Sequence, residues 1–140
     1  MGVLSDVFIG DRAEASSVVE HGPSGILPTF QAKSLDPVLL GKLEAEVTGT
    51  PYERLRHELA PDHIESDGGD SGVVAVRASL VAALGTIGDE QIPALAEAWS
   101  KAEEWFRATG TDLEPIVAGL RAIAVEALRD AKGLWVWWSI

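Results

Sequence analysis

The sequence predicts an α+β domain in which a small antiparallel or mixed sheet of about three strands packs against four to six helices. Apolar segments at opposite ends of the chain, 3–9 and 134–140, predict that both ends belong to the sheet. Between them, apolar residues recur at three- and four-residue spacings in several segments, as in amphipathic helices. The chain has 140 residues, so we expect a single globular domain over 1–140.

The last eight residues carry the clearest strand signal. Three of the five tryptophans in the chain, Trp135, Trp137 and Trp138, lie there. Trp135 and Trp137 alternate with Val136 and Trp138, so both faces are apolar, and we expect the strand to be central or covered on both sides. An antiparallel partner for it is the strand at 3–9. The sequence therefore predicts that the N- and C-terminal strands are adjacent.

The first half of the chain is predicted to alternate short elements with loops. Gly10 ends the N-terminal strand, and Asp36 followed by Pro37 supplies an N-cap and a first helical residue. Gly49 closes the helix that begins there. In chain order we expect a strand at 3–9, a helix at 11–20, a loop laid on the core at 23–33, a helix at 37–48 and a short helix at 52–59.

The second half is predicted to contain the longest helices. Residues 89–107 have the pattern of one amphipathic helix, with Phe106 in its apolar stripe and Trp105 outside that stripe. Thr111 and Glu114 have the spacing of a capping box, so the last helix is expected to begin there. In chain order the expected elements are a polar loop at 61–72, a strand at 73–76, helices at 77–87 and 89–107, a long helix after residue 111 and a strand at 134–140.

Composition excludes several classes of function. The chain has no cysteine, which excludes disulfides, thiolate zinc sites and cysteine nucleophiles. A formal net charge of −11 would repel a phosphate backbone, so we expect no nucleic-acid partner. No apolar run reaches the roughly 20 residues of a membrane helix, and no signal-peptide pattern opens the sequence. We therefore expect a cytoplasmic protein without membrane association.

Four segments of the sequence carry a resemblance to a family. They are 1–8 (Met-Gly-Val-Leu-Ser-Asp-Val-Phe), 32–37 (Ala-Lys-Ser-Leu-Asp-Pro), 133–140 (Gly-Leu-Trp-Val-Trp-Trp-Ser-Ile) and the acidic helix with Trp99. On these residues the chain resembles a family of small uncharacterised bacterial proteins, largely actinobacterial, of unknown function. The resemblance implies a cytoplasmic bacterial domain and carries no catalytic residue over to this chain.

We expect no catalytic, cofactor or metal site. His63 has acidic neighbours, but their spacing does not match a calcium loop, and a solvated acidic loop accounts for them. These neighbours are Asp62, Glu65, Asp67 and Asp70. Ser24 lacks the intervening residues of a nucleophile elbow. Gly68-Gly69 has neither the lysine of a phosphate loop nor the dinucleotide-binding spacing.

One short segment offers the side chains of a ligand pocket. A hydroxyl, two cations and a titratable ring belong to Tyr52, Arg54, Arg56 and His57. Such a set suits an anion or a carboxylate ligand, and the loop at 61–72 would close over it. This supports a small-molecule-binding or enzymatic domain as one hypothesis. The alternative is that the arginines are simply solvated.

The acidic composition favours a different hypothesis, a non-catalytic protein-interaction module of the inhibitor or immunity type, whose partner is a basic protein. Trp99 belongs to the apolar stripe and is expected in the core. Trp105 falls off the stripe beside Glu104, so it is either an exposed contact anchor or packed under a loop. A homodimer formed through an exposed sheet edge is a third possibility.

Overall fold

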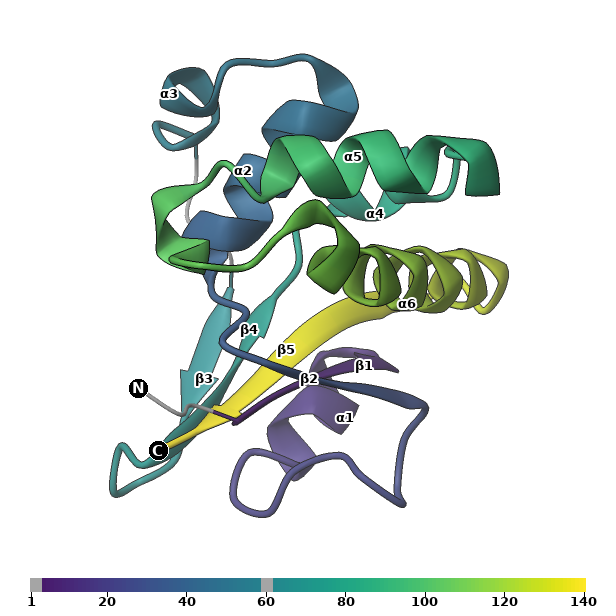
Figure 1. Ribbon diagram of the computed structural model, residues 1–140. Helices are drawn as coiled ribbons and strands as arrows, with labels where there is room; N and C mark the ends of the chain where they lie inside the picture. Colours follow the sequence, from purple (N-terminus) through teal and green to yellow (C-terminus); the bar gives the residue numbers. More distant parts are fainter. Residues whose placement is uncertain (1–3, 59–61) are drawn as a thin grey trace.

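The computed structural model describes residues 4–58 and 62–140, and its centre is an antiparallel sheet (Figure 1). The sheet has five strands in the order β2-β1-β5-β4-β3. In chain order they are β1 (Leu4–Gly10), β2 (Thr29–Lys33), β3 (His63–Glu65), β4 (Ser71–Ala75) and β5 (Gly133–Ser139). The predicted α+β class and the pairing of the terminal strands are confirmed, whereas the sheet is larger than expected.

β5 is the central strand, because it pairs with β1 on one side and with β4 on the other. Its side chains alternate between two hydrophobic cores, one on each face of the sheet. Trp135 and Trp137 are buried in the smaller core. The indole N–H of Trp137 donates to the carbonyl of Val19 at 2.9 Å, and that of Trp135 donates to the carbonyl of Gly10 at 3.0 Å. Both rings therefore bury apolar surface without leaving a donor unpaired.

Six α-helices lie in the part of the chain that the structure describes. They are α1 (Arg12–Ser17), α2 (Pro37–Thr48), α3 (Tyr52–Leu55), α4 (Ala78–Leu84), α5 (Ile92–Trp99) and α6 (Gly110–Arg129). The helices α2, α4, α5 and α6 cover one face of the sheet and enclose the larger core, while α1 lies on the opposite face (Figure 1). The predicted N-cap of α2 is confirmed, because Asp36 accepts a hydrogen bond from the amide of Leu39 at 2.8 Å.

Two strands lie where loops were expected. β2 falls within the expected loop 23–33, and β3 with the first residues of β4 falls within the expected loop 61–72. Both β2 and β3 are edge strands, and both carry exposed residues. Neither strand therefore needs an apolar run. In β2, Phe30 and Ala32 pack against the larger core while Gln31 is exposed. This alternation is too short to identify the strand from sequence.

The prediction of a single helix over 89–107 is wrong. One 3₁₀ turn, η1 (Asp89–Gln91), precedes α5, and the chain leaves the helix after Trp99 before a second 3₁₀ turn, η2 (Glu103–Trp105). The change of direction brings Trp105 edge-on to Trp99, with ring centroids 4.9 Å apart and planes at 88°. Aromatic packing thus prevails over helical continuity. Trp105 becomes half-buried, and Phe106, expected in the apolar stripe, is 84 % exposed.

The last helix also starts differently, with Thr109 and not Thr111 as its N-cap. The Thr109 hydroxyl accepts from the amide of Asp112 at 3.2 Å, and the Asp112 carboxylate accepts from the amide of Thr109 at 2.9 Å. Gly110 is the first residue of α6, and a Cβ there would lie 2.9 Å from the Cα of Glu97 in α5. The earlier start is therefore set by a close approach of two helices that only glycine permits.

Thr109→Ala should lower the free energy of unfolding by about 1 kcal/mol, because it removes the cap from the amide of Asp112. Thr111→Ala should change it by less than about 0.5 kcal/mol. Donation from the Thr109 amide and hydroxyl lowers the pKa of Asp112 in the folded protein below its ordinary value of 3.8. The ionised Asp112 therefore stabilises the fold above pH 3.8, and this contribution is lost as the pH falls through the pKa of the folded state. The effect of Thr109→Ala should therefore shrink in acid. Urea denaturation at two pH values measures it, and equal effects of both substitutions at neutral pH would contradict the assignment.

Candidate functional site

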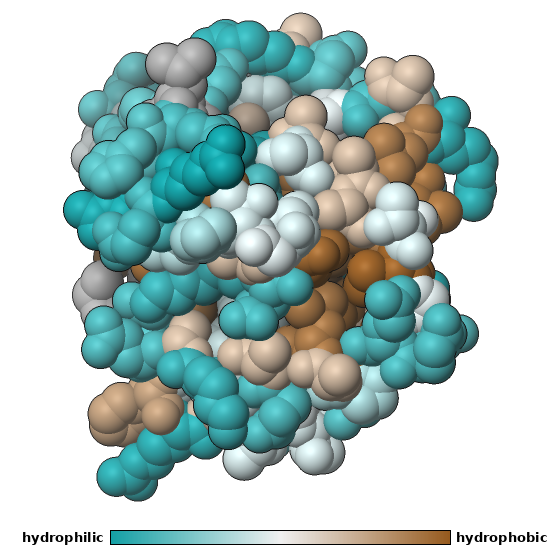
Figure 2. All heavy atoms as spheres, turned by 90° about the horizontal axis from the view of Figure 1, so that it is seen from above, coloured by the Kyte–Doolittle hydropathy of each residue, from teal (hydrophilic) through white to brown (hydrophobic). Residues whose placement is uncertain are grey.

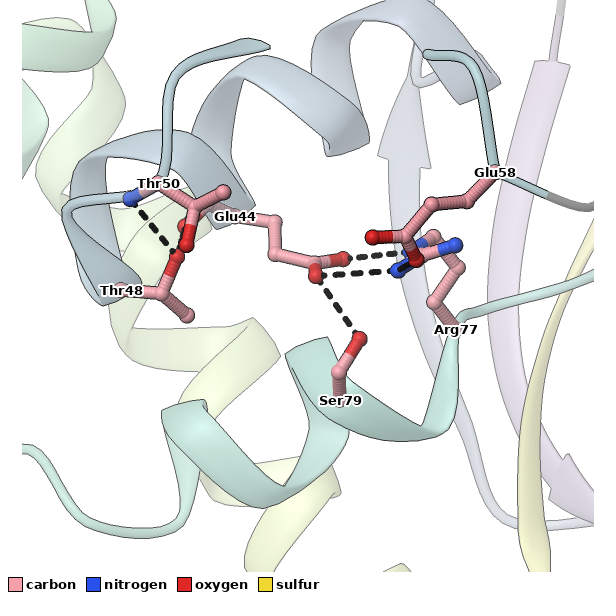
Figure 3. Close-up of polar contacts among 6 residues, drawn as sticks. All are labelled: Glu44, Thr48, Thr50, Glu58, Arg77 and Ser79. Carbon is pink, nitrogen blue, oxygen red and sulfur yellow. Dashed lines mark hydrogen bonds and ion pairs between the residues drawn. The ribbon is translucent and has the colours of Figure 1, made fainter. Parts of the chain in front are cut away.

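A buried carboxylate joins α2 to the start of α4 (Figure 3). Glu44 is 2 % exposed, and its carboxylate accepts from Nε of Arg77 at 2.9 Å and from the Ser79 hydroxyl at 2.7 Å. Arg77 also donates through Nη2 to Glu58 at 2.5 Å. Hydrogen bonds to Glu44, and then to Glu58, raise the pKa of Arg77 above its ordinary value. The buried negative charge is therefore compensated by a guanidinium and a hydroxyl.

The geometry of this ion network suits a structural role. The adjoining cavity of about 20 Å³ has space for about one water molecule. Sequence analysis missed both Glu44 and Arg77, which lie 33 positions apart in the chain. One signal was present, since Glu44 follows Leu40 at helical spacing on the apolar face of α2.

A cleft of about 440 Å³ lies between the C-terminal ends of α2 and α5. Its walls include Lys42, Tyr52 and Lys101. Tyr52 packs against Gly41, where a Cβ would lie 2.8 Å from the ring. The ammonium of Lys42 lies 5.6 Å from the centre of the Tyr52 ring and donates to Glu104 at 2.5 Å. The cleft therefore combines an aromatic ring with cations from two helical regions.

The four predicted ligand-binding residues separate in the structure. Tyr52 lines the cleft, whereas three others are exposed and are not part of its walls: Arg54, Arg56 and His57. Arg56 pairs with Glu53 in solvent at 3.2 Å. Residues 62–72 belong largely to the hairpin of β3 and β4, and Pro61 lies outside the described residues. The segment expected to close the pocket is thus a β-hairpin at the edge of the sheet, with residues 66–70 as its turn.

In the acidic segment around His63, Asp62 forms an ion pair with Arg12. Nε of Arg12 in α1 donates to the Asp62 carboxylate at 2.7 Å, which lowers the pKa of Asp62 below its ordinary value. Over residues 4–58 and 62–140, no three His, Asp or Glu side chains gather in a way that could hold a metal ion.

A broad groove of about 730 Å³ opens between β2, η2 and the first turns of α6. Apolar and acidic side chains share its lining, which includes Trp105, Phe106, Ile116, Asp6, Glu104 and Asp112. Burial raises the pKa of Asp6, whereas donation from Lys42 lowers that of Glu104. Lys33 contributes a cation at the end of β2. The groove therefore offers apolar contact within a mainly acidic rim.

Trp105 is the last residue of η2 and is half-buried, so of the two positions expected for it the freely exposed one is wrong. Its ring contacts Trp99, and its indole N–H is buried with no hydrogen-bond partner among the residues described. An unpaired buried donor costs roughly 1–3 kcal/mol. Glu104 is held by Lys42 and is only partly exposed. Trp105 is therefore a support for the groove and not a freely exposed anchor.

Phe106 is the exposed aromatic residue of this groove. Its side chain is 84 % exposed, and its backbone has φ +61° and ψ −83°. A positive φ in a bulky residue is rare and costs of order 1–3 kcal/mol. The guanidinium of Arg107 lies 5.3 Å from the ring centre. Sequence analysis missed Phe106 as a contact residue, because an uninterrupted helix would have buried it.

Five other large apolar side chains are exposed on the described surface, and two of them lie one turn apart on α6. They are Ile26, Val38, Val125, Leu128 and Ile140. Viewed from above the helical layer, most of the surface is hydrophilic and apolar atoms gather in one region (Figure 2). Phe106 differs from these five residues because it combines exposure, backbone strain and an adjoining groove.

No protein-family model, curated protein or solved structure matches the chain. None of the helices within the described residues is both long and apolar enough to cross a membrane.

Proposed function

We propose that the protein is a non-catalytic protein-interaction module, of the inhibitor or immunity type, that binds a basic partner protein at the groove between β2, η2 and α6. The observation that carries this proposal is Phe106, an exposed aromatic ring held by a strained backbone beside half-buried Trp105. A bacterial cytoplasmic location and membership of the family that the sequence resembles are parts of the same proposal.

The energetics of the η2 region support the proposal. Exposure of Phe106, its positive φ and the unpaired indole N–H of Trp105 each disfavour the free protein. Such costs persist in native proteins mainly at functional sites. Binding hot spots cluster in well-packed, desolvated pockets and are enriched in large side chains, Trp and Tyr among the aromatic ones. Coverage by a partner would recover the cost of exposing the Phe106 ring, while the strained backbone and the unpaired N–H identify the region as a candidate functional site.

Charge indicates the nature of that partner. The chain carries 22 acidic residues against 11 lysines and arginines, and the groove includes the carboxylates of Asp6, Glu104 and Asp112. Such a surface attracts a basic protein and accelerates its association at low salt. We therefore expect a complex that weakens as the salt concentration rises.

Phe106→Ala should abolish capture of the partner while leaving stability unchanged within about 0.5 kcal/mol, since an exposed side chain contributes little to folding. Phe106→Gly should also abolish capture and should raise the free energy of unfolding by about 1 kcal/mol, because glycine adopts positive φ without strain. The measurement is a pull-down from bacterial lysate at low and moderate salt, quantified by mass spectrometry, beside urea denaturation.

Ile26→Ala is the matched control, since Ile26 is another large apolar residue, 68 % exposed, that does not line this groove. It should leave capture intact. A basic protein retained by the wild-type chain and by Ile26→Ala, lost with both Phe106 substitutions and released by salt, would support the proposal. If Phe106→Ala retained the basic protein as well as the wild-type chain does, Phe106 and this groove would not be the binding site, and the proposal would be wrong.

Ligand binding is the second candidate function, favoured by the cleft of about 440 Å³ with Tyr52, Lys42 and Lys101 in its walls. Lys42 pairs with Glu104 and Lys101 with Glu97, so a carboxylate or other anionic ligand would replace these carboxylates as the partner of the two cations. A thermal-shift screen of such ligands tests it, with Lys101→Gln as the variant that should lose the ligand-induced rise in melting temperature. A screen in which no ligand raises the melting temperature would count against this candidate.

A further inference from the structure

The outer edge of β2 presents free backbone groups. The amide of Ile9 donates to the carbonyl of Pro28 at 3.1 Å, in line with the β1–β2 register that pairs Val7 with Phe30. Because hydrogen-bonded and non-hydrogen-bonded pairs alternate in antiparallel sheets, Phe30 and Ala32 direct their backbone groups toward β1. The backbone groups of the alternate residues point away from the sheet: Thr29, Gln31 and Lys33. No backbone bond from another described element reaches them.

This edge is held rigidly beneath α6. The Phe30 ring lies against Gly119, where a Cβ would come within 2.2 Å of the ring, so no larger residue fits at that point of the helix. Ala32 packs against the same larger core. The inward side chains of β2 therefore fix its position while its outward backbone groups stay available for pairing.

The edge and the groove are continuous. Gln31, Ala32 and Lys33 belong to the groove lining together with Phe106 and Ile116. A strand added beside β2 would direct alternate side chains to the groove, and backbone pairing would supply affinity while the lining selected the sequence. Apolar side chains suit Phe106 and Ile116, and basic side chains suit the carboxylates of the rim.

We infer that β2 takes up an extended segment of the basic partner as an additional antiparallel or parallel strand of the sheet. Every second side chain of that segment would face the groove, and this groove-facing set would include both apolar residues and Lys or Arg. The inference rests on the proposed function and names how that partner is bound. A second copy of this chain fits less well, since each copy carries a formal charge of −11 and the groove itself is mainly acidic.

Gln31→Pro tests the edge, because proline removes an outward amide without removing a bond to β1. Gln31→Thr is the matched control that keeps the amide. Random twelve-residue peptides displayed on phage would be selected against the full chain and synthesised for titration calorimetry. We expect peptides in which every second residue is either apolar or basic. They should bind wild type and Gln31→Thr equally and lose about tenfold or more in affinity for Gln31→Pro. Methylation of alternate peptide amides should abolish binding.

A second measurement does not depend on the folding of any variant. Addition of a selected peptide to the ¹⁵N-labelled wild-type chain should protect the amides of Thr29, Gln31 and Lys33 from hydrogen exchange. Failure to select such peptides, absence of this protection, or equal binding by Gln31→Pro and Gln31→Thr would overturn the inference. A chain that dimerises and becomes monomeric with Gln31→Pro would overturn it as well, by showing that a second copy covers the edge.

The inference and the proposed function can fail separately. If Phe106→Ala abolishes capture from lysate while Gln31→Pro retains it, the groove binds a partner but β2 does not pair with it. If Phe106→Ala retains capture, the proposed function itself is wrong.

Discussion

Arg77→Met should lower the free energy of unfolding by about 3 to 5 kcal/mol, because it leaves the carboxylate of Glu44 buried without its counter-charge. Glu44 is 2 % exposed, and the Ser79 hydroxyl would remain as its partner. Such a site must either keep an unpaired charge out of water or open to admit water, and both outcomes destabilise the contact between α2 and α4. Urea or guanidinium denaturation followed by circular dichroism measures the loss.

Two controls show whether the loss of stability comes from leaving a buried charge unpaired or from the loss of any ion pair. Arg56→Met breaks an ion pair in which both side chains are more than half exposed, and it should cost less than about 1 kcal/mol. The double substitution Glu44→Leu with Arg77→Met removes both charges from a site beside Leu40 and Leu80, and should recover most of the loss. If Arg77→Met costs no more than Arg56→Met, the Glu44 charge is not buried as the structure places it.

The contrast between predicted and missed strands has a simple physical cause. β5 is covered on both faces, so its tryptophans and valine form a run that sequence alone identifies, and its antiparallel partner β1 shares this property. The edge strands β2 and β3 carry exposed residues among half-buried ones, so neither has an apolar run. Their existence depends on pairing with distant residues, which no local pattern records.

The candidate site was missed for a related reason. Helical periodicity placed Phe106 in the core and Trp105 outside it, which holds only if the helix continues past Trp99. Contact between the rings of Trp99 and Trp105 ends that continuation and exchanges the two environments. The Glu44–Arg77 pair is likewise a contact across 33 positions. Local patterns thus predicted the terminal strands and several helices, while tertiary contacts determined the edge strands, the end of α5 and the chemistry of the surface.

Removal of residues 135–140 should abolish cooperative folding. β5 is the strand through which the pair β1–β2 is joined to the pair β4–β3, so its loss divides the sheet into two separate hairpins within the described fold. The truncation also removes buried Trp135, Val136 and Trp137. Loss of one buried tryptophan costs about 3–5 kcal/mol, and a domain is stable by only about 5–15 kcal/mol.

Deletion of Ile140 alone is the matched control, because this residue is 78 % exposed and makes a single backbone bond, from its amide to the carbonyl of Asp70 at 3.0 Å. It should keep a cooperative thermal transition, whereas the truncated chain should show none by near-ultraviolet circular dichroism and should give poorly dispersed amide resonances. A truncated chain that still melts cooperatively would mean that α2, α4, α5 and α6 form a stable core without a continuous sheet. In that case β5 would be an addition to the helical layer, and the groove beside β2 would have to be explained without a rigid sheet beneath it.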